Sequence, residues 1–375
     1  MVYFDNSSTT APSKKCIAAV LNSLDNNWGN PSSLHKLGIS AEKDLSSARE
    51  EIARRLSCDE KEIIFTSGGT EANNLAVFGS VETLKRRGTR IVTTEIEHHS
   101  VTECFDKLEK QGFEVIRIKP DKFGRISYED IYSAIDQKTI FVSIMLVNNE
   151  VGSILPINAA RDAIRDKKAP AYLHTDAVQA FGKIPVDVKD LEVDLLTVSA
   201  HKIHGPKGVG ALYKSAKFRI QPTNLGGLQE KGIRGGTEAA SLISGMGAAA
   251  SEIDLSNYEK VKELNQYLRE QLKKIDGVVI NSDDDAIPYI LNFSLLGYRS
   301  ETLLHFFESK EIYVSSGSAC AKGEPSHVLK SMGLDRDAAD GAIRLSFSSQ
   351  NTKEEADVFI SALIEAKETL ISKRR

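Results

Sequence analysis

The stretch Leu195-Leu196-Thr197-Val198-Ser199-Ala200-His201-Lys202-Ile203-His204-Gly205-Pro206-Lys207-Gly208 gives the clearest indication of the fold. Its first five residues are mostly apolar or β-branched, so they predict a buried strand. The glycines and the proline after them predict a turn, and residues 208–213 predict the next strand. Lys202 therefore lies between a buried strand and a glycine-rich turn, where its amine is shielded from water.

Short apolar runs alternate with amphipathic segments on both sides of this stretch, between about residues 60 and 215. This alternation is typical of an α/β fold with a mostly parallel sheet flanked by helices. A helix is expected at 71–87, where Thr70 can cap the first turn and leave backbone N–H groups free for an anion. Seven strands are expected, at residues 63–66, 90–94, 113–118, 140–146, 171–174, 195–199 and 208–213.

The pattern changes after the glycine-rich stretch at 226–247. Helices are expected at 251–275, at 300–309 and from Thr352 onward, and strands near 278–280, 289–293, 312–314 and 342–347. These elements predict a smaller α+β domain. We therefore expect a large domain at 16–249 and a small domain formed by 1–15 and 250–375.

Composition excludes several classes of function. The chain has 375 residues, of which 41% are hydrophobic, and 48 basic and 52 acidic residues leave a net charge of −4. This charge balance argues against nucleic acid as a direct partner. The four cysteines, Cys16, Cys58, Cys104 and Cys320, are scattered without a CxxC pair, so we expect no disulfide framework, no metal site and a cytoplasmic location. We also expect no signal peptide and no membrane segment.

Several polar residues at strand ends match what pyridoxal 5'-phosphate requires of an enzyme. That cofactor needs a lysine for its aldehyde, an acid beside its pyridine nitrogen, a flat group against its ring and an anion site for its phosphate. Lys202 can supply the amine. Asp176 can supply the acid, with a helix N-cap as the alternative. His98 can stack on the ring and move protons, with a surface histidine as the alternative, which we favour for His99.

Three further features complete the candidate site. Gly69 and Thr70 at a helix start can bind the phosphate together with Ser199 and His201, with an ordinary capped helix as the alternative. Arg344 is a single charge in an apolar strand, so it needs either a substrate carboxylate or an internal ion pair. Cys320 lies in a run of small residues that predicts a mobile loop, from which a thiolate could attack an activated substrate.

These motifs, taken in order, closely resemble the cysteine desulfurases over nearly the whole chain. The resemblance implies a fold-type I pyridoxal phosphate enzyme, usually a homodimer, that takes sulfur from L-cysteine and leaves L-alanine. It implies a persulfide that is passed to an acceptor protein for iron–sulfur cluster assembly or tRNA thiolation. The cysteine segment resembles the nitrogen-fixation and housekeeping subgroup. The matching segments are 66–71, 97–98, 147–150, 176–179, 199–202, 234–237 and 315–320.

The resemblance also implies a role for each matching residue. Lys202 matches the Schiff-base lysine, Asp176 the partner of the pyridine nitrogen, and Cys320 the persulfide carrier. The other matches are His98 as stacking and acid–base group, Gln179 as donor to the phenolic oxygen, Thr70, Ser199 and His201 at the phosphate, Thr237 at the phosphate of the neighbouring subunit, Asn149 and Arg344 at the substrate carboxylate, and Asn30 on the substrate side.

Two other readings of the sequence stay open at this point. One is a different enzyme of the same fold, such as a selenocysteine lyase or an aminotransferase acting on another amino acid. The other is a non-catalytic protein in which Cys320 is a binding or redox-sensing thiol and Lys202 is structural.

Overall fold

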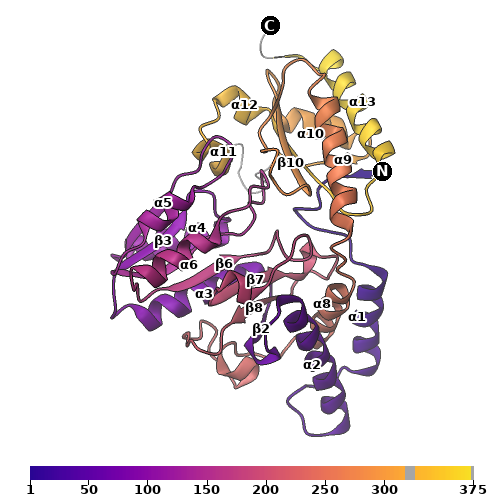
Figure 1. Cartoon of the computed structure of the whole chain (residues 1–375). Coiled ribbons are helices and arrows are strands. Elements are labelled where there is room, and N and C mark those ends of the chain that lie inside the picture. The colour runs from indigo at the N-terminus through magenta and orange to yellow at the C-terminus, as the bar shows by residue number, and fades with distance from the viewer. Residues whose placement is uncertain (317–325, 373–375) are drawn as a thin grey trace.

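A seven-stranded sheet forms the centre of the computed structural model, which describes residues 1–316 and 326–372 (Figure 1). The strand order is β2-β8-β7-β6-β5-β3-β4, and only β8 runs antiparallel to its neighbours. The mostly parallel sheet predicted from the sequence is therefore confirmed. The strands are β2 (Ile63–Thr66), β3 (Arg90–Thr94), β4 (Glu114–Ile118), β5 (Thr139–Ser143), β6 (Tyr172–Asp176), β7 (Leu195–Ser199) and β8 (Gly210–Lys214).

Helices cover both faces of this sheet because successive strand residues point to opposite sides. Ile64, Phe141 and Leu195 belong to the core under α3 (Gly69–Leu84) and α4 (His99–Lys110). Their neighbours Ile63, Val142 and Leu196 belong to the opposite core, with α2 (Lys36–Leu56), α6 (Ile157–Asp166) and α8 (Ala240–Ser251). The strands are thus apolar on both faces, as a buried parallel sheet requires.

The C-terminal part of the chain forms a second, antiparallel sheet with strand order β12-β10-β9. A separate parallel pair joins β1 (Val2–Tyr3) to β11 (Ile312–Tyr313), so the N-terminus lies beside α9 and α13 (Figure 1). The elements here are α9 (Asn257–Leu272), β9 (Val278–Ile280), β10 (Ile290–Leu295), α10 (Ser300–Glu308), α11 (His327–Ser331), α12 (Arg336–Asp340), β12 (Ala342–Ser346) and α13 (Lys353–Thr369).

The end of the glycine-rich stretch at 226–247 belongs to a helix that the sequence analysis did not predict. Residues 240–251 form α8, which packs against α1 (Lys14–Asn26) and α2. A Cβ at Gly245 would lie 2.6 Å from a methyl of Val20, and one at Gly247 would lie 2.7 Å from the Cα of Ala48. These glycines therefore permit close helix packing instead of ending a helix. The helix expected at 251–275 begins only at Asn257.

The predicted N-terminal caps of α13 and α3 have different outcomes. Thr352 caps α13 and forms a capping box with Glu355, so the predicted start of that helix is confirmed. The predicted cap at Thr70 is wrong, because Gly68 precedes α3 as its N-cap and Thr70 is the second residue inside the helix. Gly68 has φ 152°, a conformation that favours glycine and that no side-chain cap accompanies.

Among residues 1–316 and 326–372, no helix is both long and apolar enough to cross a membrane.

Gly210 at the start of β8 should be sensitive to substitution. A Cβ there would lie 2.8 Å from backbone atoms of Gly68 and Val198, which cannot move as a side chain can. We expect Gly210→Ala to destabilise the fold by about 1–3 kcal/mol, measured as a lower midpoint of thermal or urea unfolding. Gly227→Ala is the matched control, since its Cβ would meet only the flexible end of the Gln229 side chain. Equal midpoints for the two variants would contradict the close packing at Gly210.

Candidate active site

A cavity of about 360 Å³ opens where the parallel strands of the large sheet end. This edge collects side chains from several strands because the carboxyl ends of parallel strands lie together. Nearly all of the residues expected from the sequence line it, together with residues from the N-terminal segment. The lining residues are Ser7, Ser8, Gly69, Thr70, Asn73, His98, His99, Ser100, Met145, Asn149, Glu150, Asp176, Val178, Gln179, Ser199, His201, Lys202, His327 and Arg344.

Lys202 reaches this cavity from the short 3-10 turn η2 (Ala200–Lys202) that follows β7. Its Nζ donates hydrogen bonds to the backbone carbonyl oxygens of Ser7 and Ser8, the second at 2.8 Å. Burial and the positive charge of Arg344 lower the pKa of Lys202 to about 8, against the opposing effects of Asp5 and Asp176. With this pKa, about a tenth of the amine is uncharged, and nucleophilic, at pH 7.

Asp176 lies at the end of β6, and both of its oxygens have partners. Oδ1 accepts the backbone N–H of Val178 at 2.9 Å, and Oδ2 accepts Nδ2 of Asn73 at 2.8 Å. The capping alternative is therefore partly realised, but for a turn and not for a helix. Since Asp176 also faces the cavity, Asn73 and the turn fix a carboxylate that can accept a proton-bearing nitrogen.

His98 is the N-cap of α4, and its Nδ1 lies 2.8 Å from Oγ of Ser100. The ring is exposed toward the open cavity, yet burial of its remaining faces lowers its pKa, as does the charge of Lys202, while Asp176 opposes both. The ring is thus neutral and fixed at one nitrogen. His99 is also exposed, but it is more than a surface residue, because it lines the cavity and its ring centre lies 4.7 Å from that of His327.

The anion end of the cavity is formed where α3 begins. Gly69 and Thr70 are the first two residues of α3, whose N-terminal N–H groups have no partner within the helix. Ser199 at the end of β7 and His201 line the same region. Burial, Lys202 and Lys207 lower the pKa of His201 to about 4, so its ring is neutral. These groups can donate hydrogen bonds to a phosphate.

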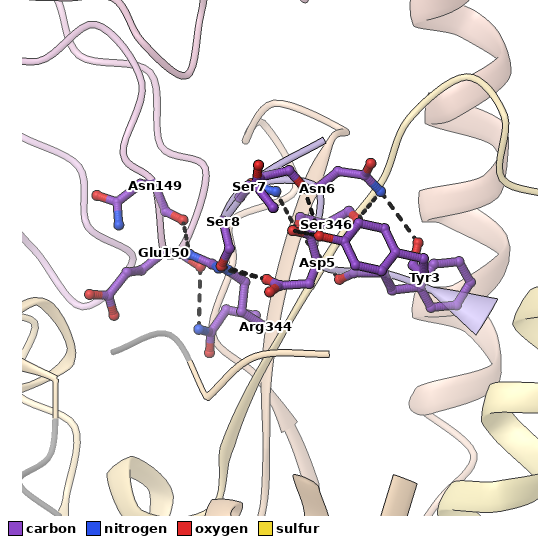
Figure 2. Close-up of polar contacts among 12 residues, drawn as sticks. Tyr3, Asp5, Asn6, Ser7, Ser8, Asn149, Glu150, Arg344 and Ser346 are labelled. Atoms are coloured by element: carbon purple, nitrogen blue, oxygen red, sulfur yellow. Dashed lines mark hydrogen bonds and ion pairs between the residues drawn. The ribbon is translucent and has the colours of Figure 1, made fainter. Parts of the chain in front are cut away.

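Arg344 enters the cavity from β12 and has less than a tenth of its surface exposed. Figure 2 shows its guanidinium between the N-terminal segment and Asn149. Nη2 contacts Oδ1 of Asp5 at 2.9 Å and Oγ of Ser8 at 2.7 Å, and Nη1 donates to the backbone oxygen of Asn149 at 2.9 Å. The internal ion pair considered from the sequence therefore exists, with Asp5 as partner.

This ion pair does not use the whole guanidinium. Nε of Arg344 is buried and has no hydrogen-bond partner among the described residues. An arginine can donate five hydrogen bonds, and the contacts with Asp5, Ser8 and Asn149 use three of them. Arg344 therefore retains donors for a ligand carboxylate, although the ion pair already holds the side chain in place.

Two buried acids, Glu150 and Glu97, were not singled out by sequence reasoning. Glu150 lines the cavity, and burial raises its pKa to about 7, although the hydroxyl of Ser326 and the charge of Arg344 lower it. Burial also raises the pKa of Glu97 to about 8. Both lie in segments that carry the family resemblance, 97–98 and 147–150. Only their burial in the folded chain raises their pKa toward neutral pH.

The N-terminal segment is the other part of the site that the sequence did not reveal. Asp5 pairs with Arg344, and the carbonyl groups of Ser7 and Ser8 hold Lys202. Residues 5–10 read Asp-Asn-Ser-Ser-Thr-Thr, and this polar run was the available signal. Asn73, which orients Asp176, gave no signal because an asparagine inside a helix is most often unremarkable.

Three predicted residues are not brought into this cavity. Thr237 and Asn30 are exposed and do not line it, and the side chain of Asn30 instead accepts the backbone N–H of Ser32. Cys320 lies outside the described residues. The chain on either side of its segment is anchored at the cavity, because Ser315 pairs with Arg344 through backbone hydrogen bonds and Ser326 donates to Glu150.

Comparison with known proteins identifies the family to which the chain belongs. Residues 2–359 match the family model described as aminotransferase class-V, so the chain belongs to that family. A solved structure titled NIFS-like protein superposes with a TM-score of 0.93 at 36% identity, covering 98% of this chain and 100% of that protein. The α/β fold inferred from the strand pattern is therefore shared along nearly the whole chain.

The relatives narrow the class to the cysteine desulfurases. Cysteine desulfurase IscS of Clostridium botulinum (strain Hall) is 41% identical over 372 residues, which cover 96% of this chain and 93% of that protein. A structure titled SspA in complex with cysteine has a TM-score of 0.83 at 31% identity and covers 94% of this chain and 100% of that protein.

The cofactor of these enzymes is pyridoxal 5'-phosphate, and the cavity fits it. The amine of Lys202, the carboxylate of Asp176 and the N-terminus of α3 supply three of the four kinds of group that the cofactor requires, and the ring of His98 supplies the fourth. The buried Oδ1 of Asn73 and Nε of Arg344 have no partner among the described residues. A bound ligand could therefore supply the hydrogen-bond partners that these two buried atoms lack.

The lowered pKa of Lys202 gives a pH-dependent prediction. Only the uncharged amine can bond to the cofactor aldehyde, so uptake of cofactor by the apoprotein should accelerate as pH rises and level off above about pH 8. A lysine at its ordinary value of 10.5 would keep accelerating past pH 9. Stopped-flow absorbance at a series of pH values measures the profile.

The Asp5→Asn variant is the matched test of this explanation. The carboxylate of Asp5 raises the pKa of Lys202, so its removal should move the plateau to lower pH. Borohydride reduction followed by peptide mass analysis must locate the cofactor on Lys202. A profile without a plateau below pH 10 would contradict the desolvated amine.

Proposed function

We propose that this protein is a pyridoxal phosphate-dependent cysteine desulfurase that converts L-cysteine to L-alanine and holds the sulfur as a persulfide on Cys320. The observation that carries the proposal is the sharing of one cavity by Lys202, whose pKa is near 8, by Asp176 and by a buried arginine, Arg344. The relatives named cysteine desulfurase and the cysteine-bound neighbour support the choice of substrate.

Each part of the cavity has a role in holding the cofactor. The aldehyde belongs at Lys202, the pyridine nitrogen at Asp176, and the phosphate at Gly69, Thr70, Ser199 and His201. His98 would cover the ring, and Gln179 would donate to its phenolic oxygen. When bound there, the cofactor withdraws electrons from the substrate and so weakens the bonds around its Cα and Cβ atoms.

The side chains of the cavity then bind the substrate and move protons. Arg344 and Asn149 hold the carboxylate of L-cysteine, and the ion pair with Asp5 keeps the guanidinium oriented. Lys202 can accept and return a proton at the Cα atom, because its pKa near 8 permits both states. His98 has a lowered pKa and can accept a proton from a thiol group.

Sulfur leaves the substrate by attack of a cysteine thiolate. A bond forms between the sulfur of Cys320 and the sulfur of the substrate, while the bond between that sulfur and Cβ breaks. The electron pair of the broken bond stays with the carbon skeleton, which takes up protons and becomes L-alanine. Overall, one thiol and L-cysteine become one persulfide and L-alanine, and an acceptor protein for cluster assembly or tRNA thiolation then removes the sulfur.

We place this activity in a homodimer with a two-domain subunit. A large domain at 16–249 carries the cofactor groups, and a small domain at 1–15 and 250–375 carries Arg344 and Cys320. Exposed apolar side chains support a second copy as partner, among them Trp28 at 67%, Leu225 at 86% and Leu228 at 88% exposure. We propose a cytoplasmic location, in keeping with free thiols at Cys16, Cys58 and Cys104.

Two variants should separate cofactor chemistry from sulfur transfer. Lys202→Ala should reduce alanine formation to background, because no other lysine lines the cavity in the described part of the chain. Cys320→Ser should still change the absorbance of the bound cofactor when L-cysteine is added, but form no persulfide. Intact-mass analysis after incubation with L-cysteine should show one added sulfur only when Cys320 is present.

Two results would contradict parts of this proposal. Normal sulfur transfer by Cys320→Ser would remove the role of that thiol. Faster turnover of L-selenocysteine with little turnover of L-cysteine would instead assign the protein as a selenocysteine lyase.

The exposed position of Thr237 predicts that two subunits share each site. Cells that produce both Thr237→Ala and Lys202→Ala chains, each with its own tag, yield mixed dimers. If Thr237 serves the partner's phosphate, one site of the mixed dimer has both Lys202 and Thr237 and should recover about half of the wild-type activity per dimer. If Thr237 serves its own subunit, neither site is complete and activity should stay at the level of the single variants.

A further inference from the structure

Lys183 is a buried lysine that the catalytic scheme does not use. It follows β6 by seven residues, and only 6% of its surface is exposed. Its Nζ donates to Oε1 of Gln179 at 2.7 Å and lies 6.0 Å from the centre of the Tyr289 ring. Among residues 1–316 and 326–372, Lys183 forms no ion pair with a carboxylate. A buried amine without a counter-charge is costly, so a specific role is expected.

The surroundings of Lys183 disfavour the protonated form of its amine. Burial, together with the positive charges of Lys202 and Arg344, lowers its pKa to about 7. On its other side, Lys183 lines a second cavity of about 190 Å³ that is also lined by His204, Glu252 and Asp254. Whether charged or neutral, its amine remains a hydrogen-bond donor toward Gln179.

Gln179 connects this lysine to the active site. Gln179 lines the main cavity with 4% of its surface exposed, and its Nε2 donates to the backbone oxygen of Ser7 at 3.0 Å. The same oxygen of Ser7 accepts Nζ of Lys202. Gln179 and Lys202 thus share an acceptor, and the amide nitrogen of Gln179 lies on the side of the reactive amine.

The contacts with Lys183 and Ser7 together decide the orientation of the Gln179 amide. A reversed amide would place NH₂ against the amine of Lys183, so two donors would meet, and it would place the amide oxygen against the carbonyl of Ser7, so two acceptors would meet. Each mismatch leaves a buried polar group unsatisfied. The observed orientation is therefore the only one in which both ends of the amide are paired.

We propose that Lys183 is a positioning residue that holds Gln179 with its N–H donors toward the phenolic oxygen of the bound cofactor. This inference rests on the proposed function, because it requires that Gln179 contacts the cofactor. Without Lys183 only the contact with Ser7 holds the amide, and the reversed orientation, which presents an acceptor to an oxygen that carries negative charge, becomes less unfavourable. The positive charge of Lys183, when present, also polarises the amide and strengthens its donor end.

The test is a double-mutant cycle on cofactor affinity, measured with pyridoxal 5'-phosphate and the apoprotein at one fixed pH. Lys183→Met keeps the aliphatic stem and removes the donor, and Gln179→Ala removes the amide. Each single variant should weaken binding about tenfold, as expected for one buried hydrogen bond. The double variant should bind no more weakly than Gln179→Ala alone, because Lys183 acts through Gln179.

Controls separate this effect from a general loss of structure. Lys189→Met makes the same change at an exposed lysine nearby and should bind the cofactor as the wild type does. Lys183→Arg retains a donor and should recover most of the affinity. The absorbance maximum of the bound cofactor should shift in the same direction in Lys183→Met and Gln179→Ala, which a merely structural role of Lys183 would not produce. Lys183→Leu also removes the donor and replaces Lys183→Met should that variant fail to fold.

Three outcomes would overturn the inference. Wild-type affinity and absorbance in Lys183→Met would show that the amide needs no support. Additive losses in the double variant would show that Lys183 acts independently of Gln179. Unchanged affinity in Gln179→Ala would remove both the inference and the assignment of Gln179 to the cofactor, whereas a loss in Gln179→Ala alone would leave that assignment standing.

Discussion

Lys202 and Arg344 place two positive charges on one buried cavity, and the same N-terminal segment holds both of them. The carbonyl oxygens of Ser7 and Ser8 accept the lysine amine, while Asp5 and the hydroxyl of Ser8 accept the guanidinium. Burial and the positive charge of Arg344 lower the pKa of the Lys202 amine, and the carboxylate of Asp5 opposes that effect. This balance leaves Lys202 partly uncharged at the pH at which the cell operates, and the proposed chemistry depends on that state.

The large sheet makes this arrangement possible because it brings the ends of its parallel strands to one edge. Asp176 ends β6 and Ser199 ends β7, while α3 begins directly after β2. The antiparallel β8 also begins at this edge, where Gly210 lies against Gly68. The residues proposed to hold the ring nitrogen and the phosphate, and Lys202, thus lie at the ends of strands and helices, whereas Arg344 and the segment of Cys320 come from the C-terminal part of the chain.

Predictions from the sequence were most accurate where the chain repeats a strong local pattern. All seven strands of the large sheet were located to within a few residues, since β-branched runs between polar turns have few other solutions. The same reasoning missed α8, because Gly245 and Gly247 looked like signals for a loop. These glycines let α8 pack closely against α1 and α2. This packing joins segments far apart in the sequence, so a short stretch of sequence cannot reveal it.

By itself, the sequence determined the fold class, and it indicated Lys202 and most of the other residues that line the same cavity, since strand periodicity and motif chemistry are local properties. The tertiary structure alone decided which acids bind protons near neutral pH, as for Glu97 and Glu150, because pKa shifts depend on burial. It also decided that Asp5 is the partner of Arg344 and that Lys183 supports Gln179. Asp5 and Arg344 are separated by 339 residues along the chain, and only the completed fold brings such groups within hydrogen-bonding distance.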